Sequence, residues 1–194
     1  MLPLTSAARC WLLGLARGAV EAAGRGEPFP LPPFPPDFCS CDVEELRRPR
    51  AAFVSLHRKG QLRGCVGRIS ADTPLVELVP EMAQAAACED VRFSPVSADE
   101  LSDIVFEISV LSPFFTIRAE EVVPGLHGLL VRQGLRRGLL LPQVASLHQW
   151  DSERFLSEAC RKAGLPADAW QRGAAVEAFL ADIIADNAST EPRP

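Results

Sequence analysis

The stretch AAFVSLHRKGQLRGCVGRI, residues 51–69, decides how this sequence folds. Two β-like runs, residues 51–57 and 62–69, flank a short polar segment in which Gly60 suits a tight turn. The pattern predicts an antiparallel hairpin. Because side chains alternate along a strand, Arg63 and Cys65 are expected on one face of the second strand if no bulge intervenes.

The rest of the chain adds helices and further strands around this hairpin. Apolar periodicity and caps predict helices over residues 6–23, 71–90 and 151–163, and a strand over residues 103–112. A second hairpin is expected over residues 127–142, with Gly134 at its turn. Residues 174–184 suit either a helix or a strand. Residues 24–37 are expected to form a Pro-rich extended loop. The elements do not alternate as βαβ units, so the predicted fold class is α+β with antiparallel sheets.

Length and composition exclude several classes of protein. The 194 residues are 47% hydrophobic, which suits one ordinary domain or two small lobes that share a core. The net charge of -5 argues against a general binder of nucleic acid or of anionic membranes. The apolar run at residues 11–16 is too short for a signal peptide or a membrane span. We therefore expect a cytoplasmic protein; its oligomeric state stays open.

Neither a metal nor a cofactor is predicted. Without a signal sequence, the six cysteines are expected to be free thiols. Cys39 and Cys41 could supply half of a zinc site, but no second ligand pair completes it. The chain also lacks a phosphate-binding glycine loop, a GxSxG elbow and an HExxH motif.

Cys65 is the candidate reactive group. A thiol attacks as a thiolate, which nearby positive charge stabilises, and Arg63 and Arg68 lie close in sequence. The flanking glycines would let a substrate or a second backbone approach. The alternative is structural, because cysteine is among the residues most often buried in strands. The pattern leaves both interpretations open.

Three further polar residues lie in apolar surroundings. Asp90 and Arg92 belong to EDVRFSP, and Glu107 lies in the middle of the strand FEISVLS. A buried carboxylate needs a partner, and Arg63 or Arg92 would serve. These residues either form structural ion pairs or line the polar floor of a cleft that holds an acid, an arginine and a thiol.

Five ordered motifs resemble one known family. FVSLHRKGQLRGCVG, DVRFSPV, EISVLS, RRGLLLPQVA and CRKAGLPADAW are similar to segments of the AMMECR domain family, whose prokaryotic members are also called AmmeMemoRadiSam system protein A. The resemblance covers about residues 46–170. The hallmark is LRGCVG, residues 62–67, in which Val66 replaces the more usual isoleucine. The Pro-rich loop and the scarcity of lysine depart from the family pattern.

The resemblance implies a single AMMECR-type domain over residues 1–194, with two unequal lobes and the hallmark near a cleft between them. It also implies two partners, a Memo-type protein and a radical S-adenosylmethionine enzyme, but no established reaction. One hypothesis is an enzyme or enzyme subunit in which Cys65 is the nucleophile, Arg63 activates it or binds an anionic substrate, and Glu107 or Asp90 positions an arginine. The expected ligand-binding residues are Leu62, Gly64, Val66, Gly67, Asp90 and Arg92. The other hypothesis is a non-catalytic module that docks on a partner through the same segment.

Overall fold

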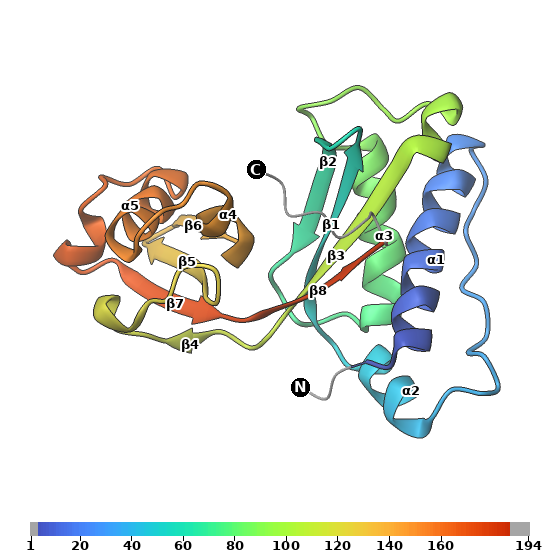
Figure 1. The fold of residues 1–194 in the computed structure, drawn as a ribbon, viewed down its shortest axis with the longest axis horizontal. Coiled ribbons are helices and arrows are strands. Elements are labelled where there is room, and N and C mark those ends of the chain that lie inside the picture. Colours follow the sequence, from blue (N-terminus) through green and yellow to red (C-terminus); the bar gives the residue numbers. More distant parts are fainter. Residues whose placement is uncertain (1–3, 187–194) are drawn as a thin grey trace. The chain divides into compact units, whose positions relative to one another are not determined.

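The computed structural model describes residues 4–186, which divide into two compact units (Figure 1). The first unit comprises the chain up to residue 110 and from residue 183, and the second comprises residues 111–182. The chain contains helices and two antiparallel sheets, so the α+β prediction is confirmed. Each unit has its own hydrophobic core and is described separately.

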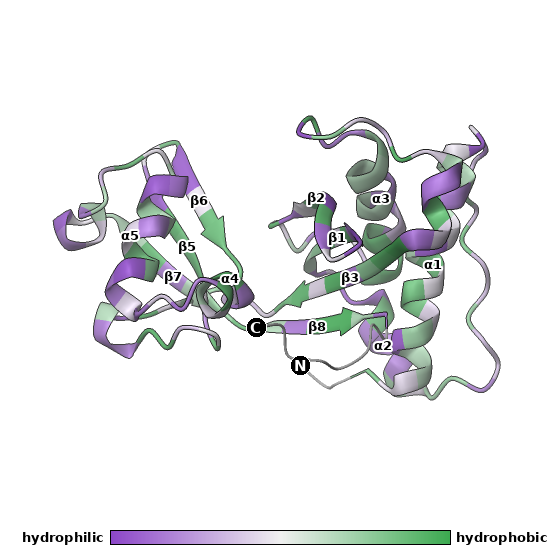
Figure 2. Cartoon of the chain, turned by 45° about the horizontal axis from the view of Figure 1, so that its top comes forward, coloured by the Kyte–Doolittle hydropathy of each residue, from purple (hydrophilic) through white to green (hydrophobic). Residues whose placement is uncertain are grey.

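The first unit is built on a four-stranded sheet with the order β2-β1-β3-β8. Its helix α3 lies between this sheet and α1, and the inner face of β3 contributes Phe106 and Ile108 to the core (Figure 1). Most of β3 is accordingly apolar in Figure 2. The elements of this unit are α1 (Ser6–Gly24), α2 (Ser40–Arg47), β1 (Ala51–Arg58), β2 (Gln61–Arg68), α3 (Leu75–Cys88), the 3-10 helix η1 (Ala98–Asp103), β3 (Ile104–Leu111) and β8 (Ala181–Ala185).

The predicted hairpin is present as β1 and β2, which pair antiparallel. Lys59 and Gly60 form its turn, both with positive φ (50° and 77°), as a two-residue type I′ loop requires. The register then shifts by one residue, because Leu56 lies opposite Gly64 whereas the next residue, His57, lies opposite Leu62. Arg63 is therefore an extra, bulged residue. The expectation that Arg63 and Cys65 share a face required an unbroken strand. Because a bulge interrupts the pleat, simple alternation does not apply to these two residues.

The second unit contains a sheet with the order β4-β7-β5-β6, and all three neighbouring pairs are antiparallel. Helix α5 buries Phe155, Leu156 and Ala159 in its core. Residues 174–184, ambiguous in the sequence, form strands because β7 gains partners on both sides. The elements are β4 (Phe115–Thr116), η2 (Ala119–Glu121), β5 (Gly128–Gln133), β6 (Arg136–Leu140), α4 (Pro142–Leu147), α5 (Ser152–Lys162), η3 (Ala169–Arg172) and β7 (Ala175–Phe179).

The Pro-rich loop packs onto α1 and leads into α2. The sequence did not predict this short helix. The rings of Phe34 and Phe38 lie 5.4 and 5.5 Å from that of Trp11. At the start of α2, Cys39 and Cys41 form a disulfide bond. The expectation of six free thiols is therefore wrong for this pair, because the first turn of α2 brings the two Cα atoms within 5.3 Å of each other.

Over residues 4–186, no helix combines the length and the apolar character needed to cross a membrane. The longest, α1, has 19 residues and carries Arg9 and Arg17.

Candidate functional site

Cys65 lies on β2 directly opposite Ser55 of β1. The Ser55 hydroxyl donates a hydrogen bond to Cys65 Sγ over 3.2 Å. Ser55 is buried, whereas Cys65 is only half-buried. The thiol is thus held by a neighbour on the next strand and keeps partial access to solvent.

The segment after α3 completes the free edge of β2 at this residue. Since β2 is the outermost strand of its sheet, the outward N–H and C=O of Cys65 have no strand to pair with. Asp90 Oδ2 accepts the Cys65 N–H over 2.8 Å, and Arg92 Nη2 donates to the Cys65 carbonyl over 3.2 Å. Asp90 and Arg92 therefore replace a neighbouring strand at one position of the edge.

Asp90 also fixes Arg92 in place. Its carboxylate accepts hydrogen bonds from the Arg92 backbone N–H (3.1 Å), Nε (2.9 Å) and Nη2 (2.6 Å). The Asp90 side chain is 5% exposed, and that of Arg92 is 54% exposed. One end of the pair is therefore anchored in the protein, and the other faces solvent.

The electrostatics of this group favour a charged Asp90 and a charged Arg92. The hydrogen bond from Arg92 holds the pKa of Asp90 far below its usual range, against the effect of burial, and the Cys65 N–H adds to the decrease. Asp90 in turn raises the pKa of Arg92, and the neighbouring Cys65 side chain adds to this rise. A fixed positive charge thus lies beside the thiol. We call Ser55, Cys65, Asp90 and Arg92 the Cys65 cluster.

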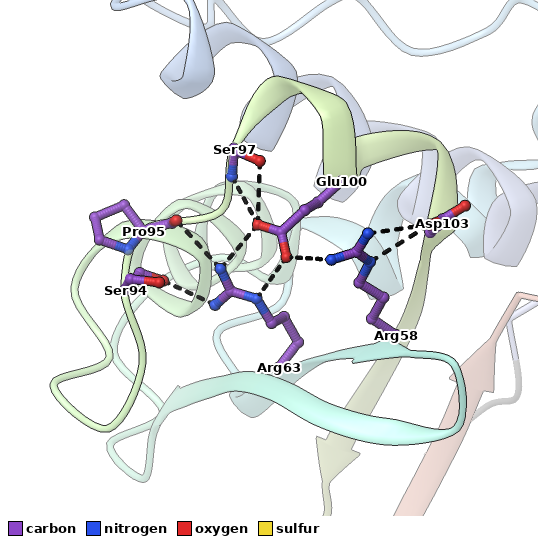
Figure 3. A network of polar contacts seen from close by, with 7 residues as sticks. All are labelled: Arg58, Arg63, Ser94, Pro95, Ser97, Glu100 and Asp103. Atoms are coloured by element: carbon purple, nitrogen blue, oxygen red, sulfur yellow. Dashed lines mark hydrogen bonds and ion pairs between the residues drawn. The ribbon is translucent and has the colours of Figure 1, made fainter.

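Arg63 belongs to a different set of contacts, centred on Glu100 (Figure 3). Arg63 Nε and Nη2 donate to the two Glu100 carboxylate oxygens over 3.0 and 2.9 Å. The same guanidinium donates to the carbonyl oxygens of Ser94 (2.8 Å) and Pro95 (3.2 Å). Arg58 Nη1 adds a third contact to Glu100 over 2.8 Å. Arg63 thus ties the loop before η1 to the hairpin, and it uses four hydrogen bonds to do so.

Glu100 owes its position to a local cap. Its carboxylate accepts the backbone N–H of Ser97 over 2.9 Å, completing a capping box at the start of η1 (Figure 3). The bidentate contact with Arg63 is the main reason that the pKa of Glu100 falls to about 2, and the Ser97 amide adds to the shift.

This shift predicts how stability changes with pH. A carboxyl group whose pKa is lowered in the folded state stabilises the fold above its unfolded pKa, and the contribution is lost as the pH falls through the folded pKa. We expect Glu100→Gln to lower the free energy of unfolding by about 2 kcal/mol at pH 7. The difference from the wild type should shrink below pH 4.5 and vanish near pH 2. Urea unfolding at several pH values measures it, and a difference that is independent of pH would contradict the assignment.

The two hallmark glycines are needed for packing. A Cβ atom on Gly64 would lie 2.1 Å from the backbone oxygen of Ala86 in α3. A Cβ atom on Gly67 would lie 2.2 Å from the Phe53 ring. The close approach predicted for these glycines is therefore made by a second backbone and by a ring of the same chain.

The remaining predicted site residues lie apart from the thiol's contacts. Leu62 is 40% exposed and borders a pocket of about 250 Å³, whereas Val66 packs against the core of the first unit. Glu107 lies half-buried on β3. The acid that binds Arg63 is Glu100, which the sequence did not single out. The pocket is lined by Arg58, Lys59, Gln61, Leu62, Arg63 and Glu100.

Comparison with known proteins assigns the family. The family model described as AMMECR1 matches residues 13–184. The chain belongs to the AMMECR1 family. It is 42% identical over 165 residues to a protein of Methanothermobacter thermautotrophicus, covering 81% of this chain and 82% of that one. It is 36% identical over 188 residues to protein MJ0810 of Methanocaldococcus jannaschii, covering 92% and 88% of the two chains.

A solved structure of similar fold supports this assignment. The crystal structure of the uncharacterized protein PH0010 from Pyrococcus horikoshii has a TM-score of 0.86 and 35% sequence identity, and the match covers 97% of this chain and 96% of that one. The AMMECR1 family is of uncharacterized function, so its members supply no reaction for the Cys65 cluster.

Two functional candidates, Ser55 and Glu100, were missed in the sequence. Ser97 and Glu100 have the spacing of a capping box in the sequence SADE, but this spacing indicates only a local turn. Ser55 could be placed opposite Cys65 only once the bulge at Arg63 was known, because the bulge sets the register of the hairpin.

Proposed function

We propose that the Cys65 cluster is a binding and reaction site in which the thiol attacks an electrophilic, anionic substrate. The observation that carries this proposal is the pairing of a half-buried thiol with a guanidinium that Asp90 holds beside it. Positive charge next to a cysteine stabilises the thiolate, which is the attacking form. Ser55 donates a hydrogen bond to the same sulfur and orients it.

Arg92 also supplies a docking point for a negative charge. Its Nε and Nη2 are engaged by Asp90 and by the Cys65 carbonyl. Within the described residues, Nη1 makes no hydrogen bond to the protein, and the side chain is half exposed. This nitrogen is therefore positioned to bind a carboxylate or phosphate oxygen next to the thiol.

The experiment compares two alkylating reagents of similar size, iodoacetate, which is an anion, and iodoacetamide, which is neutral. We expect the ratio of the iodoacetate rate to the iodoacetamide rate to be roughly threefold higher at Cys65 than at the exposed cysteines Cys10 and Cys88. Peptide mass spectrometry measures all three in one sample. In Arg92→Gln, the ratio at Cys65 should fall to that of the exposed cysteines, and their ratios should not change.

A different outcome would favour the docking hypothesis. If Cys65 resists both reagents while Cys10 and Cys88 react, the thiol is not available as a nucleophile. A folded Cys65→Ala variant that retains full activity in cells would support the same conclusion, since the residue would then matter only for its small volume.

We also propose the partners that the family resemblance implies, a Memo-type protein and a radical S-adenosylmethionine enzyme. Support comes from the resemblance of the hallmark segment and not from any surface of this chain. Affinity purification of the tagged chain from its own host, followed by mass spectrometry, tests this proposal. Recovery of neither protein from cells that express both would contradict it.

A further inference from the structure

The disulfide between Cys39 and Cys41 is poorly placed to stabilise the fold. It spans a sequence separation of two residues. A cross-link stabilises a fold mainly by restricting the unfolded chain, and this effect is smallest for the shortest loops. The bond therefore adds little to the stability of the first unit through chain entropy.

Other contacts hold α2 without the disulfide. Asp42, which is buried, accepts hydrogen bonds from the Thr5 N–H (3.0 Å) and hydroxyl (2.7 Å). Glu45 forms a buried ion pair with Arg50 over 2.6 Å, and Leu46 is fully buried in the core. Opening the disulfide would leave each of these contacts in place, so the helix can persist in both redox states.

The two sulfur atoms are not equivalent. Cys39 is the N-cap of α2, whereas Cys41, which is exposed, lies within its first turn. Cys39 Sγ accepts the backbone N–H of Asp42 over 3.2 Å. Unpaired N–H groups at a helix N-terminus favour a thiolate, so Cys39 is the better leaving group and Cys41 is the sulfur that an incoming thiolate attacks.

The surface of α2 offers room for a partner molecule. A pocket of about 560 Å³ runs along α2, and its lining includes Ser40, the residue between the two cysteines. Its other lining residues are Val43, Glu44, Arg47 and Arg48. A thiol-bearing group can therefore rest on the surface of α2 at Ser40, one residue from each cysteine.

We propose that the Cys39–Cys41 pair is a redox-active site that exchanges two electrons with a dithiol. A thiolate of the dithiol attacks Cys41 Sγ, forms a mixed disulfide and releases Cys39 as a thiolate. The second thiol of the partner then attacks its own sulfur in the mixed disulfide and releases Cys41. The partner leaves as a disulfide, Cys39 and Cys41 each take up a proton, and the site has gained two electrons and two protons.

The test uses the whole chain in mixtures of reduced and oxidised dithiothreitol. After acid quenching and alkylation with N-ethylmaleimide, mass spectrometry of the peptide containing both cysteines gives the reduced fraction. We expect a reversible two-electron transition with unchanged far-UV circular dichroism. A pair that does not re-form its disulfide in oxidised dithiothreitol would overturn the proposal. Loss of helical signal on reduction would also overturn it, because the bond would then be structural.

Tandem mass spectrometry tests the direction of attack. The oxidised chain is exposed to reduced glutathione, quenched with acid and digested, and the glutathione adduct is expected on Cys41 at least roughly fivefold more often than on Cys39. Equal occupancy, or more adduct on Cys39, would overturn the assignment of Cys41 as the attacked sulfur. None of these measurements involves Cys65, so their outcome does not depend on whether the proposal for the Cys65 cluster is correct.

Discussion

Gly64→Ala is expected to lower the free energy of unfolding by about 3 kcal/mol or more, the upper end for overpacking a core. The added methyl group would lie 2.1 Å from the Ala86 carbonyl oxygen, which belongs to the backbone of α3 and cannot rotate away. Either β2 or α3 must move, and the core between α3 and the sheet would open. Urea denaturation of the purified variant, or its loss from the soluble fraction, measures the effect.

Gly14→Ala is the matched control. Gly14 lies in α1, is exposed, and has no neighbouring atom within 4 Å of the added methyl group. Alanine is the better helix former, so this variant should be more stable by about 0.5–1 kcal/mol. If Gly64→Ala were as stable as the wild type, close packing would not explain why LRGCVG has glycine at this position.

Asp90→Ala is expected to cost about 3 kcal/mol and to abolish the preference of Cys65 for iodoacetate. The substitution leaves the Cys65 N–H without its acceptor and releases Arg92, whose Nε and Nη2 both bind the carboxylate. Stability loss and loss of selectivity should therefore appear together. Chemical denaturation and the two-reagent alkylation experiment measure the two effects.

Asp168→Ala is the comparison on the surface. Asp168 pairs with Arg172 one helical turn away, with side chains 41% and 73% exposed, and such pairs contribute at most about 0.5 kcal/mol. If Asp90→Ala weakened the fold no more than this control, the Asp90–Arg92 pair would not brace the edge of β2. If selectivity survived in a folded Asp90→Ala protein, Asp90 would not be what positions Arg92.

Local patterns predicted the elements of the fold well. The β1–β2 hairpin follows from Gly60 and its flanking apolar runs, and α5 follows from Asp151, whose side chain caps it by accepting the N–H of Arg154. Each of these signals depends on residues that are neighbours in the chain. The short α2 was missed because its N-cap is Cys39, a residue not typical of that position.

The partners of the charged residues could not be predicted in the same way. Arg63 binds Glu100, 37 positions away, because the loop before η1 folds back onto the hairpin. Each arginine of this region could have paired with several acids. The choice depends on the path of the chain, which alternation and capping do not encode.

For QLRGCVGRI, the sequence by itself determined the strand, its place in a hairpin and its membership of a hallmark motif. The tertiary structure decided which charged residues contact Arg63 and Cys65. Arg63, at the bulge, binds Glu100, and the segment after α3 brings Asp90 and Arg92 to Cys65 from 25 and 27 positions away. Strand formation depends on local periodicity, whereas the charge beside a thiol depends on which distant segment packs against it.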